Sequence, residues 1–120
     1  MAGIFENEYG SITVSGSVIS AIAGSVATKC YGVVGMAFKN TKDGIVNLLK
    51  AGNISKGVKV TFDEDGKMHI NLHIIVQYGV NINAICESIR NNVRYQVTSI
   101  TGIEVAEVTV YVESVRIAGN

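Results

Sequence analysis

The chain alternates between stretches whose apolar residues recur every three or four positions and stretches whose apolar residues recur at every second position. The longest helical pattern spans residues 81–101. Its apolar positions are Ile82, Ile85, Ile89, Val93, Val97 and Ile100. Because this spacing puts them on one side of a helix, the pattern predicts a long amphipathic helix that packs against a sheet. Asn81 or Asn83 can cap its first turn.

Runs with period two supply strands for that sheet at residues 58–62, 68–76 and 106–112. Between the first two runs, the segment DEDG at residues 63–66 predicts a hairpin turn, because aspartate and glycine tolerate positive φ. The long helix between the last two runs permits a right-handed crossover, which makes those two strands parallel. Beyond residue 112 the apolar positions change phase, so a bulge or the end of the strand is expected near Ser114.

The first half of the chain has weaker patterns. Residues 1–10 are expected to form a loose arm, and residues 11–15 a short strand at a sheet edge. A second helix is predicted by apolar residues at helical spacing, and Gly32 is expected to end it. Those residues are Val18, Ile19, Ile22, Ala23, Val26 and Cys30. Gly24, in the middle of this helix, indicates close packing against another element.

Residues 33–39, with the sequence VVGMAFK, favour an extended segment or strand. Asn40 or Thr41 can cap a short third helix over residues 42–51, which is expected to end at Gly52. That helix would pack through Ile45, Leu48 and Leu49. Residues 53–57 are expected to form a loop.

Together these elements predict a single domain over residues 1–120. The fold class is α/β (α+β), a two-layer sandwich in which helices pack on one face of a mixed β-sheet, because three amphipathic helices can cover only one face well. The other face would then carry His69, His73, Ile75 and Gln77 from one strand, and Thr109, Tyr111 and Glu113 from another. Such a face is either simply solvated, or a surface for self-association or partner docking to which Ile75 and Tyr111 are the pointers.

Composition narrows the function classes. Ten basic and ten acidic residues cancel, so no overall field steers the protein toward nucleic acid or an anionic membrane. The first ten residues lack the features of a secretory signal, and no apolar segment reaches the ~18 residues of a membrane span. A cytoplasmic protein is therefore expected, with Cys30 and Cys86 reduced and buried in helices.

A local excess of lysine suggests an alternative function. Between residues 29 and 59, six lysines accompany a single acid, Asp43. They are Lys29, Lys39, Lys42, Lys50, Lys56 and Lys59. The segment GVVG at residues 32–35 spells the GxxG loop of KH domains, so a KH-like nucleic-acid binder is the alternative. Valines in place of basic residues within that loop argue against it, and a solvated lysine surface is the simpler interpretation.

Candidate chemistry is sparse. Sets such as Ser-His-Asp arise only by free choice among unrelated positions, and the phosphate-binding and dinucleotide-binding glycine patterns do not occur. No cofactor and no metal is expected. On a strand, at ~3.3 Å per residue, His69 and His73 are about 13 Å apart, too far to share one ion. The DEDG turn lacks the distal glutamate of a calcium loop.

Four segments resemble a known family. They are GSITVSGSVISAIAGSVATKCYGVVGMA, SKGVKV, HINLHIIVQYGVNI and VRYQVTSITGIEVAEVTVYVESVRI. The most specific pieces are CYGVVGM at residues 30–36, the Tyr78-Gly79 turn, and the closing strand with Val108, Val110 and Val112. Over residues 9–117 the chain is similar to the alkaline shock protein family of Gram-positive bacteria, also called the glucose-starvation or envelope stress response family. It is most similar to the short members that consist of the domain alone.

The resemblance implies a small, non-enzymatic cytoplasmic protein associated with cell-envelope homeostasis and stress. Some members sit at the membrane through a small integral-membrane anchor protein, others are linked to fatty-acid metabolism, and the family has no agreed catalytic residues. We therefore expect an interaction or scaffold protein that forms a homo-oligomer. Any placement at the inner face of the cell membrane would come through such an anchor, and nucleic acid is not an expected partner.

Overall fold

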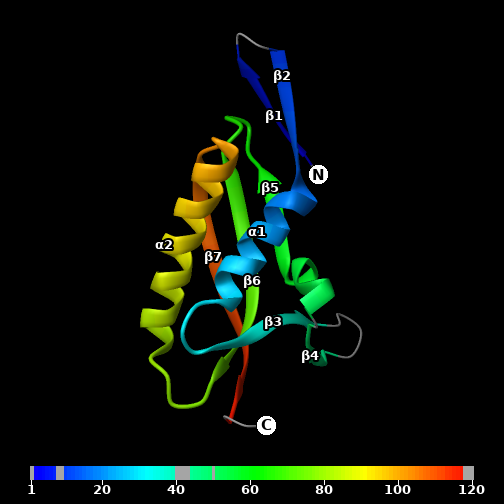
Figure 1. The fold of residues 1–120 in the computed structure, drawn as a ribbon. Helices are drawn as coiled ribbons and strands as arrows, with labels where there is room; N and C mark the ends of the chain where they lie inside the picture. Colours follow the sequence, from blue (N-terminus) through cyan, green and yellow to red (C-terminus); the bar gives the residue numbers. More distant parts are fainter. Residues whose placement is uncertain (1, 8–9, 40–43, 50, 118–120) are drawn as a thin grey trace.

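Two helices lie on one face of a five-stranded sheet, and a separate hairpin made by the first two strands projects from this body (Figure 1). The computed structural model describes residues 2–7, 10–39, 44–49 and 51–117. In chain order the elements are β1 (Ala2–Asn7), β2 (Gly10–Ser15), α1 (Gly16–Thr28), β3 (Val33–Lys39), β4 (Val46–Leu48), the 3₁₀-helix η1 (Ala51–Gly57), β5 (Val58–Phe62), β6 (Met68–Gln77), α2 (Ile82–Thr101) and β7 (Val105–Arg116). This is the predicted two-layer α+β arrangement.

The sheet is built around β6. Strand β7 runs parallel to it along one edge, as the crossover through α2 predicts. Strands β5 and β3 share the other edge, where β5 pairs antiparallel with the first half of β6 and β3 with the second half. Strand β4 extends the sheet beyond β3. The sheet is therefore mixed, and β7 is an edge strand within the described part of the chain.

Helix α2 begins and ends where its sequence predicts. The Ala84 N–H donates to the side-chain oxygen of Asn81 (3.1 Å), and Gly102 at φ 73° closes the last turn through an N–H···O bond to Thr98. The four middle positions of the apolar stripe are buried, but Ile82 and Ile100 are exposed. A straight helix touches a twisted sheet mainly along its middle, so the prediction for these two end residues is wrong.

Helix α1 turns a face of small residues toward the body, so its predicted stripe is displaced. Ile19, Ala23 and Ala27 are fully buried, whereas Val18 is 51% exposed. A Cβ on Gly24 would lie 3.5 Å from the Ile54 carbonyl oxygen, which confirms close packing against η1 at that point. The helix ends at Thr28, before the predicted stop. Gly32, at φ 86°, instead sits in the turn that leads into β3.

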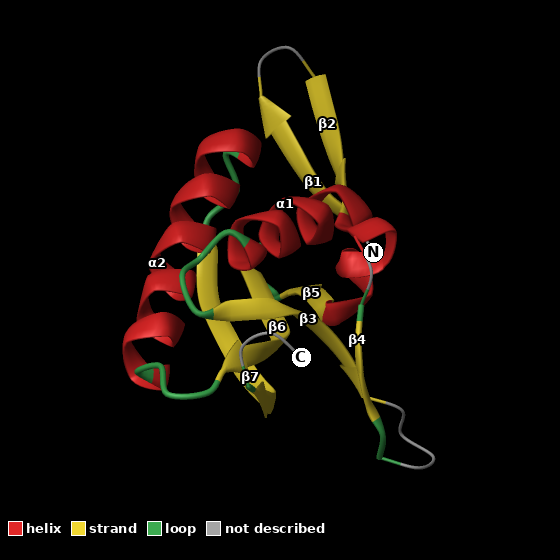
Figure 2. Cartoon of the chain, turned by 60° about the horizontal axis from the view of Figure 1, so that its bottom comes forward, coloured by secondary structure: helices red, strands yellow, loops and turns green. Residues whose placement is uncertain are grey.

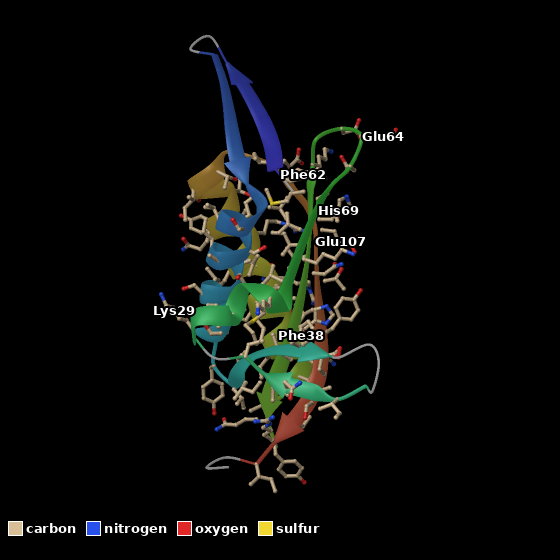
Figure 3. All side chains as sticks on the ribbon, turned by 90° about the vertical axis from the view of Figure 1, so that its right-hand side faces the viewer. Lys29, Phe38, Phe62, Glu64, His69 and Glu107 are labelled. Carbon is tan, nitrogen blue, oxygen red and sulfur yellow. The ribbon has the colours of Figure 1, made fainter. Side chains whose placement is uncertain are left out.

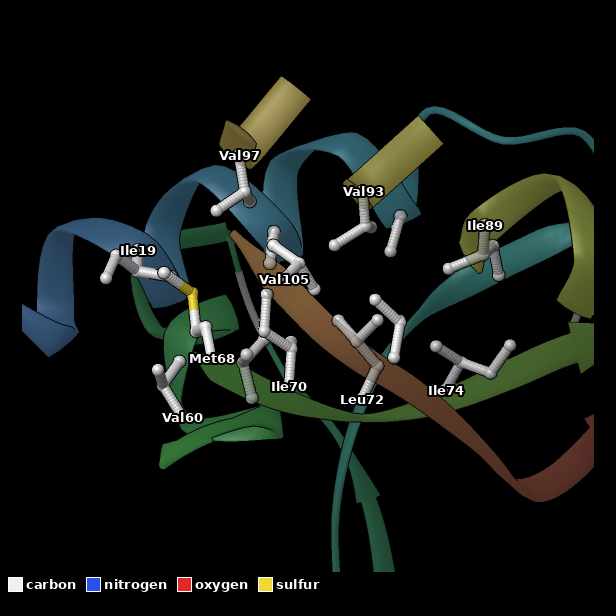
Figure 4. Close-up of a cluster of buried hydrophobic side chains, with 14 of the residues drawn as sticks. Ile19, Val60, Met68, Ile70, Leu72, Ile74, Ile89, Val93, Val97 and Val105 are labelled. Atoms are coloured by element: carbon white, nitrogen blue, oxygen red, sulfur yellow. The ribbon is translucent and has the colours of Figure 1, made fainter. Parts of the chain in front are cut away.

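The core fills the space between the two helices and the sheet (Figure 4). The strands β5 and β6 and the middle of α2 contribute their predicted apolar positions, whereas Val105 of β7 enters the core out of the predicted phase, because a bulge separates it from Val108. Helix α2 contributes Ile85, Ile89, Val93 and Val97, β6 contributes Met68, Ile70, Leu72, Ile74 and Val76, and the flanking strands contribute Val58, Val60, Val105 and Val108. Burial of this apolar surface is the main free energy that holds the two layers together.

The predicted third helix does not form. Residues 46–48 are β4, which pairs with Ala37 to Lys39, and residues 51–57 are η1 rather than a helix end followed by a loop. Three apolar residues at positions 45, 48 and 49 fit a short helix or a strand equally well, and pairing with β3 satisfies the backbone of this segment. Ile45 and Leu48 are exposed and Leu49 is half-buried. The proposed caps Asn40 and Thr41 lie outside the described residues.

The N-terminal segment is a hairpin and not a loose arm. Strand β1 pairs antiparallel with β2 over residues 2–7 and 10–15, in a sheet of its own (Figures 1 and 2). Strand β2 was expected at an edge of the main sheet. It is instead one strand of this separate two-stranded hairpin. The alternation at residues 11–15 identified a strand correctly, but alternation does not specify which strand pairs with it.

Two bulges interrupt β7. The register passes from Met68↔Val105 to His69↔Glu107, which leaves Ala106 without a partner on β6. It passes again from Ile74↔Val112 to Ile75↔Ser114, which confirms the bulge predicted near Ser114.

Candidate functional site

The face of the sheet that points away from the helices is open along β5, β6 and β7. Figure 3 shows the sheet nearly edge-on, with His69 and Glu107 on the side opposite the helices. Strand register places eight side chains on this open face: Lys59 and Thr61 from β5, His69, Asn71 and His73 from β6, and Glu107, Thr109 and Tyr111 from β7. Glu113, in the second bulge of β7, joins them through its contact with His73. Within the described residues no helix covers them.

At one end of the open face, His69 is tied to the hairpin turn before β6. Its Nε2 lies 3.0 Å from Asp63 Oδ2, while Asp63 Oδ1 accepts the N–H groups of Asp65 (2.9 Å) and Lys67 (3.0 Å). The hydrogen bond with His69, helped by the two backbone N–H groups, lowers the pKa of the Asp63 carboxyl below its ordinary value. The Asp63 carboxylate therefore stabilises the hairpin turn through three hydrogen bonds.

At the centre of the open face, three side chains from neighbouring strands come together. The His73 and Tyr111 rings stack with centroids 4.8 Å apart and planes 12° from parallel. The His73 Nδ1 lies 3.5 Å from Glu113 Oε1, close enough for a charge interaction when the ring is protonated, but without hydrogen-bond geometry. Tyr111 remains 44% exposed, so part of its side chain is accessible on the open face.

The predicted surface residue Ile75 does not belong to the open face. It is fully buried. Its register partner is Gly35 on β3, and a Cβ there would lie 2.7 Å from the Leu48 Cδ1 of β4. Gln77 is half-buried beyond this point, opposite Arg116. Thr109 lies on the open face as predicted, and its hydroxyl donates to Glu107 Oε1 (2.8 Å).

The segment GVVG does not form a loop between two helices. Gly35 is buried within β3, and the segment connects α1 to a strand. Among the predicted lysines, Lys29 lies on the helix side of the molecule, away from Lys59 (Figure 3). The side chains of Lys39, Lys42 and Lys50 lie outside the described residues. The arrangement that a KH-type clamp requires is thus not present at residues 32–35.

Cys86 lies within a helix as expected, whereas Cys30 lies just outside one, and neither is fully buried. Both are free, Cys30 in the turn after α1 and Cys86 in α2, and both are half-buried. Cys30 Sγ lies 3.5 Å from the Val26 carbonyl oxygen and accepts a long contact from the Asn92 amide (3.8 Å). Burial raises the pKa of the Cys86 thiol, which disfavours the reactive thiolate.

A groove that the sequence did not suggest runs between α2 and the start of β7. Its volume is about 820 Å³, and α2 lines one wall with residues at helical spacing. Those residues are Asn91, Arg94, Tyr95, Thr98 and Ser99, and the other wall is Lys67 with Glu104, Val105 and Ala106. The first bulge of β7 falls at Ala106, in the wall of this groove, and neither apolar periodicity nor composition indicates that bulge.

Among the described residues there is no cluster of three metal-ligating side chains, and neither helix is long and apolar enough to cross a membrane. The fold and its open face define a small two-layer α+β domain that buries one face of its sheet and presents the other. The chain belongs to the alkaline shock protein 23 family, which has a cell envelope-related function and whose family model matches residues 5–117.

Relatives of the chain occur in Gram-positive bacteria. It is 41% identical to the uncharacterized protein YloU of Bacillus subtilis over 111 residues, which cover 92% of each chain. It is 34% identical to the uncharacterized protein Spy1614 of Streptococcus pyogenes, again over 92% of each. The uncharacterized protein YqhY of Bacillus subtilis is 28% identical over 92% of this chain and 81% of its own length. None of these names assigns a catalytic activity. No solved structure matches the chain.

Proposed function

We propose that the chain is a non-enzymatic interaction or scaffold protein of the cell envelope, and that it self-associates through the open face of its sheet. The observation that carries this proposal is the uncovered three-strand surface with an exposed tyrosine at its centre. Covering the exposed apolar part of such a face with a partner is favourable, because it removes apolar surface from water.

Charge on the open face favours a second copy of the chain as the occupant. The base Lys59 lies on β5 at one side, and the acids Glu107 and Glu113 lie on β7 at the other. Two copies stacked face to face about a two-fold axis along the strands would set the β5 of one over the β7 of the other. Each Lys59 would then meet the acids of its partner, which makes the surface self-complementary.

Sedimentation velocity over a range of protein concentrations tests the self-association. We expect a dimer whose population rises with protein concentration. Lys59→Glu and Glu107→Lys should each raise the Kd of this dimer about fivefold or more, and the double variant should restore dimerisation. Tyr111→Lys should also dissociate the dimer. The matched control is Tyr31→Lys, which changes an exposed tyrosine in the turn after α1. A wild-type protein that stays monomeric at high concentration, or a double exchange without recovery, would refute self-association by this face.

The envelope role is the finer part of the proposal. The family's cell envelope-related function supports a part in envelope stress response or lipid homeostasis. We propose that the protein is cytoplasmic and reaches the inner face of the membrane by binding a small integral-membrane anchor protein. Crosslinking in intact cells followed by purification from the membrane fraction should recover such a protein. Recovery of RNA alone would instead favour nucleic-acid binding.

A further inference from the structure

The outer edge of β7 is the longest unpaired edge in the described part of the chain, and it is accessible. Strand β7 spans 12 residues, and its register pairs it with β6 on one side only. An edge strand of this length presents a row of backbone N–H and C=O groups that a further strand can pair with. The groove beside residues 104–106 gives such a strand room to enter.

Near the start of β7, one long hydrogen bond from a side chain occupies a backbone carbonyl group of this edge. The guanidinium of Arg94 donates to the carbonyl oxygen of Ala106, at 3.4 Å and on an exposed surface. Ala106 is the residue that the bulge leaves without a partner on β6. A backbone N–H from an added strand would satisfy this carbonyl at shorter distance, and the same step would free the guanidinium for another acceptor.

The charged side chains that line the groove favour an acidic occupant. A strand added to β7 would lie beneath the stripe of α2 that carries Asn91, Arg94 and Tyr95. Alternate side chains of that strand would point at the stripe. The Glu104 carboxylate already forms an ion pair with Lys67, with 3.9 Å between Oε2 and Nζ. Arg94 has no carboxylate partner among the described residues. A glutamate or aspartate on the added strand would pair with the freed guanidinium.

A second copy of β7 fits this groove poorly. The face of β7 that looks toward α2 carries Val108, Val110 and Val112, and its acids lie on the opposite face. Pairing of two β7 strands would therefore set valines against the polar stripe and leave Arg94 without its acid. We propose that the groove between α2 and β7 binds an extended acidic peptide segment of another protein, which adds to the sheet as a strand and pairs with Arg94.

Nuclear magnetic resonance titration with defined peptides tests this proposal on the full chain. The probe is a capped ten-residue peptide of alternating threonine and glutamate, and the comparison peptide has lysine in place of glutamate. We expect saturable binding with Kd on the order of 100 μM for the acidic peptide. The amide shifts should centre on residues 104–108 and the α2 stripe, and the lysine peptide should not bind.

Arg94→Glu should weaken binding of the acidic peptide about tenfold or more. The matched control is Arg90→Glu, which makes the same charge change on an exposed residue of α2 outside the groove. Equal losses in the two variants, or shifts centred on His73 and Tyr111, would overturn the proposal. So would amide shifts at residues 104–106 and Arg94 that depend on protein concentration without peptide in the Tyr111→Lys variant, in which the open face is disabled, because these would assign the edge to a second copy. The proposed self-association does not depend on this result, since its variants lie on the open face.

Discussion

Ile75 is the residue at which the open face of the sheet ends. It has the same strand phase as His69 and His73, so alternation alone assigns it to the surface. Its burial is decided by β3 and β4, because β3 pairs beside it at Gly35 and the Leu48 side chain of β4 lies over that glycine. Period two predicts the side of a sheet on which a residue lies, and it does not predict what the rest of the chain places there.

Replacement of Ile75 measures this burial. Ile75→Ala removes a fully buried side chain, and we expect the free energy of unfolding to fall by about 2–4 kcal/mol. Denaturant unfolding followed by circular dichroism gives the value. Ile117→Ala is the matched control, because Ile117 is 65% exposed, and it should change stability by less than about 0.5 kcal/mol. A loss of stability below about 1 kcal/mol for Ile75→Ala would place this side chain back on the surface.

The polar residues of the open face were easier to predict than their contacts. His69, His73, Thr109 and Tyr111 all lie on the predicted side of the sheet. The stacking of His73 on Tyr111 depends on the parallel register of β6 and β7, which two bulges set. No sequence pattern indicated the contact made by Arg94, because its acceptor is the carbonyl oxygen of Ala106, a residue in a bulge 12 positions further along the chain.

At the scale of elements, strong and long patterns predicted structure well. The strands β5 and β6, the hairpin between them and α2 all form where expected, because each combines a clear period with turn or capping residues. Short segments failed. Residues 42–51 lack enough apolar positions to distinguish a helix from a strand, and pairing with β3 decided the conformation of residues 46–48. The face that α1 buries was also set by packing, since η1 approaches its small residues.

The turn from α1 into β3 joins the two layers, and Gly32 is the residue that permits it. Its φ of 86° disfavours any side chain, and a Cβ there would also overlap the Ile85 Cδ1 of α2. Gly79 has nearly the same φ, 87°, but nothing lies within 4 Å of its Cβ position. A comparison of alanine substitutions at the two glycines therefore distinguishes the cost of backbone strain from the cost of side-chain overlap.

We expect Gly79→Ala to cost about 1–2 kcal/mol from positive φ alone. Gly32→Ala should cost about 1–3 kcal/mol more, because Ile85 must move within the core. Thermal unfolding of both variants under identical conditions gives the difference. Equal destabilisation would mean that α2 does not press against this turn.

At the scale of the whole molecule, a central five-stranded sheet is accompanied by a peripheral hairpin with a sheet of its own. Strand β6 has neighbours along both edges, and five of its alternate residues lie in the core. The β1–β2 hairpin pairs only with itself within the described residues. A two-stranded hairpin without a further strand is marginally stable in water. Stability should therefore be distributed unevenly, highest in β6 and lowest in the hairpin.

Native-state hydrogen exchange measures this distribution. Amides of residues 70–74 should exchange only through global unfolding, whereas those of residues 2–7 and 10–15 should exchange by local opening that costs at most about 2 kcal/mol. Deletion of residues 1–15 should leave the exchange rates of residues 70–74 unchanged within about threefold, because β6 takes its partners from β3, β5 and β7. If the deletion accelerated exchange in β6, the hairpin would be part of the cooperative core. Unchanged exchange in β6 would mean that the central sheet alone provides the stability of the domain. The same sheet carries the two surfaces proposed to bind partners, because the open face and the β7 edge both lie next to β6.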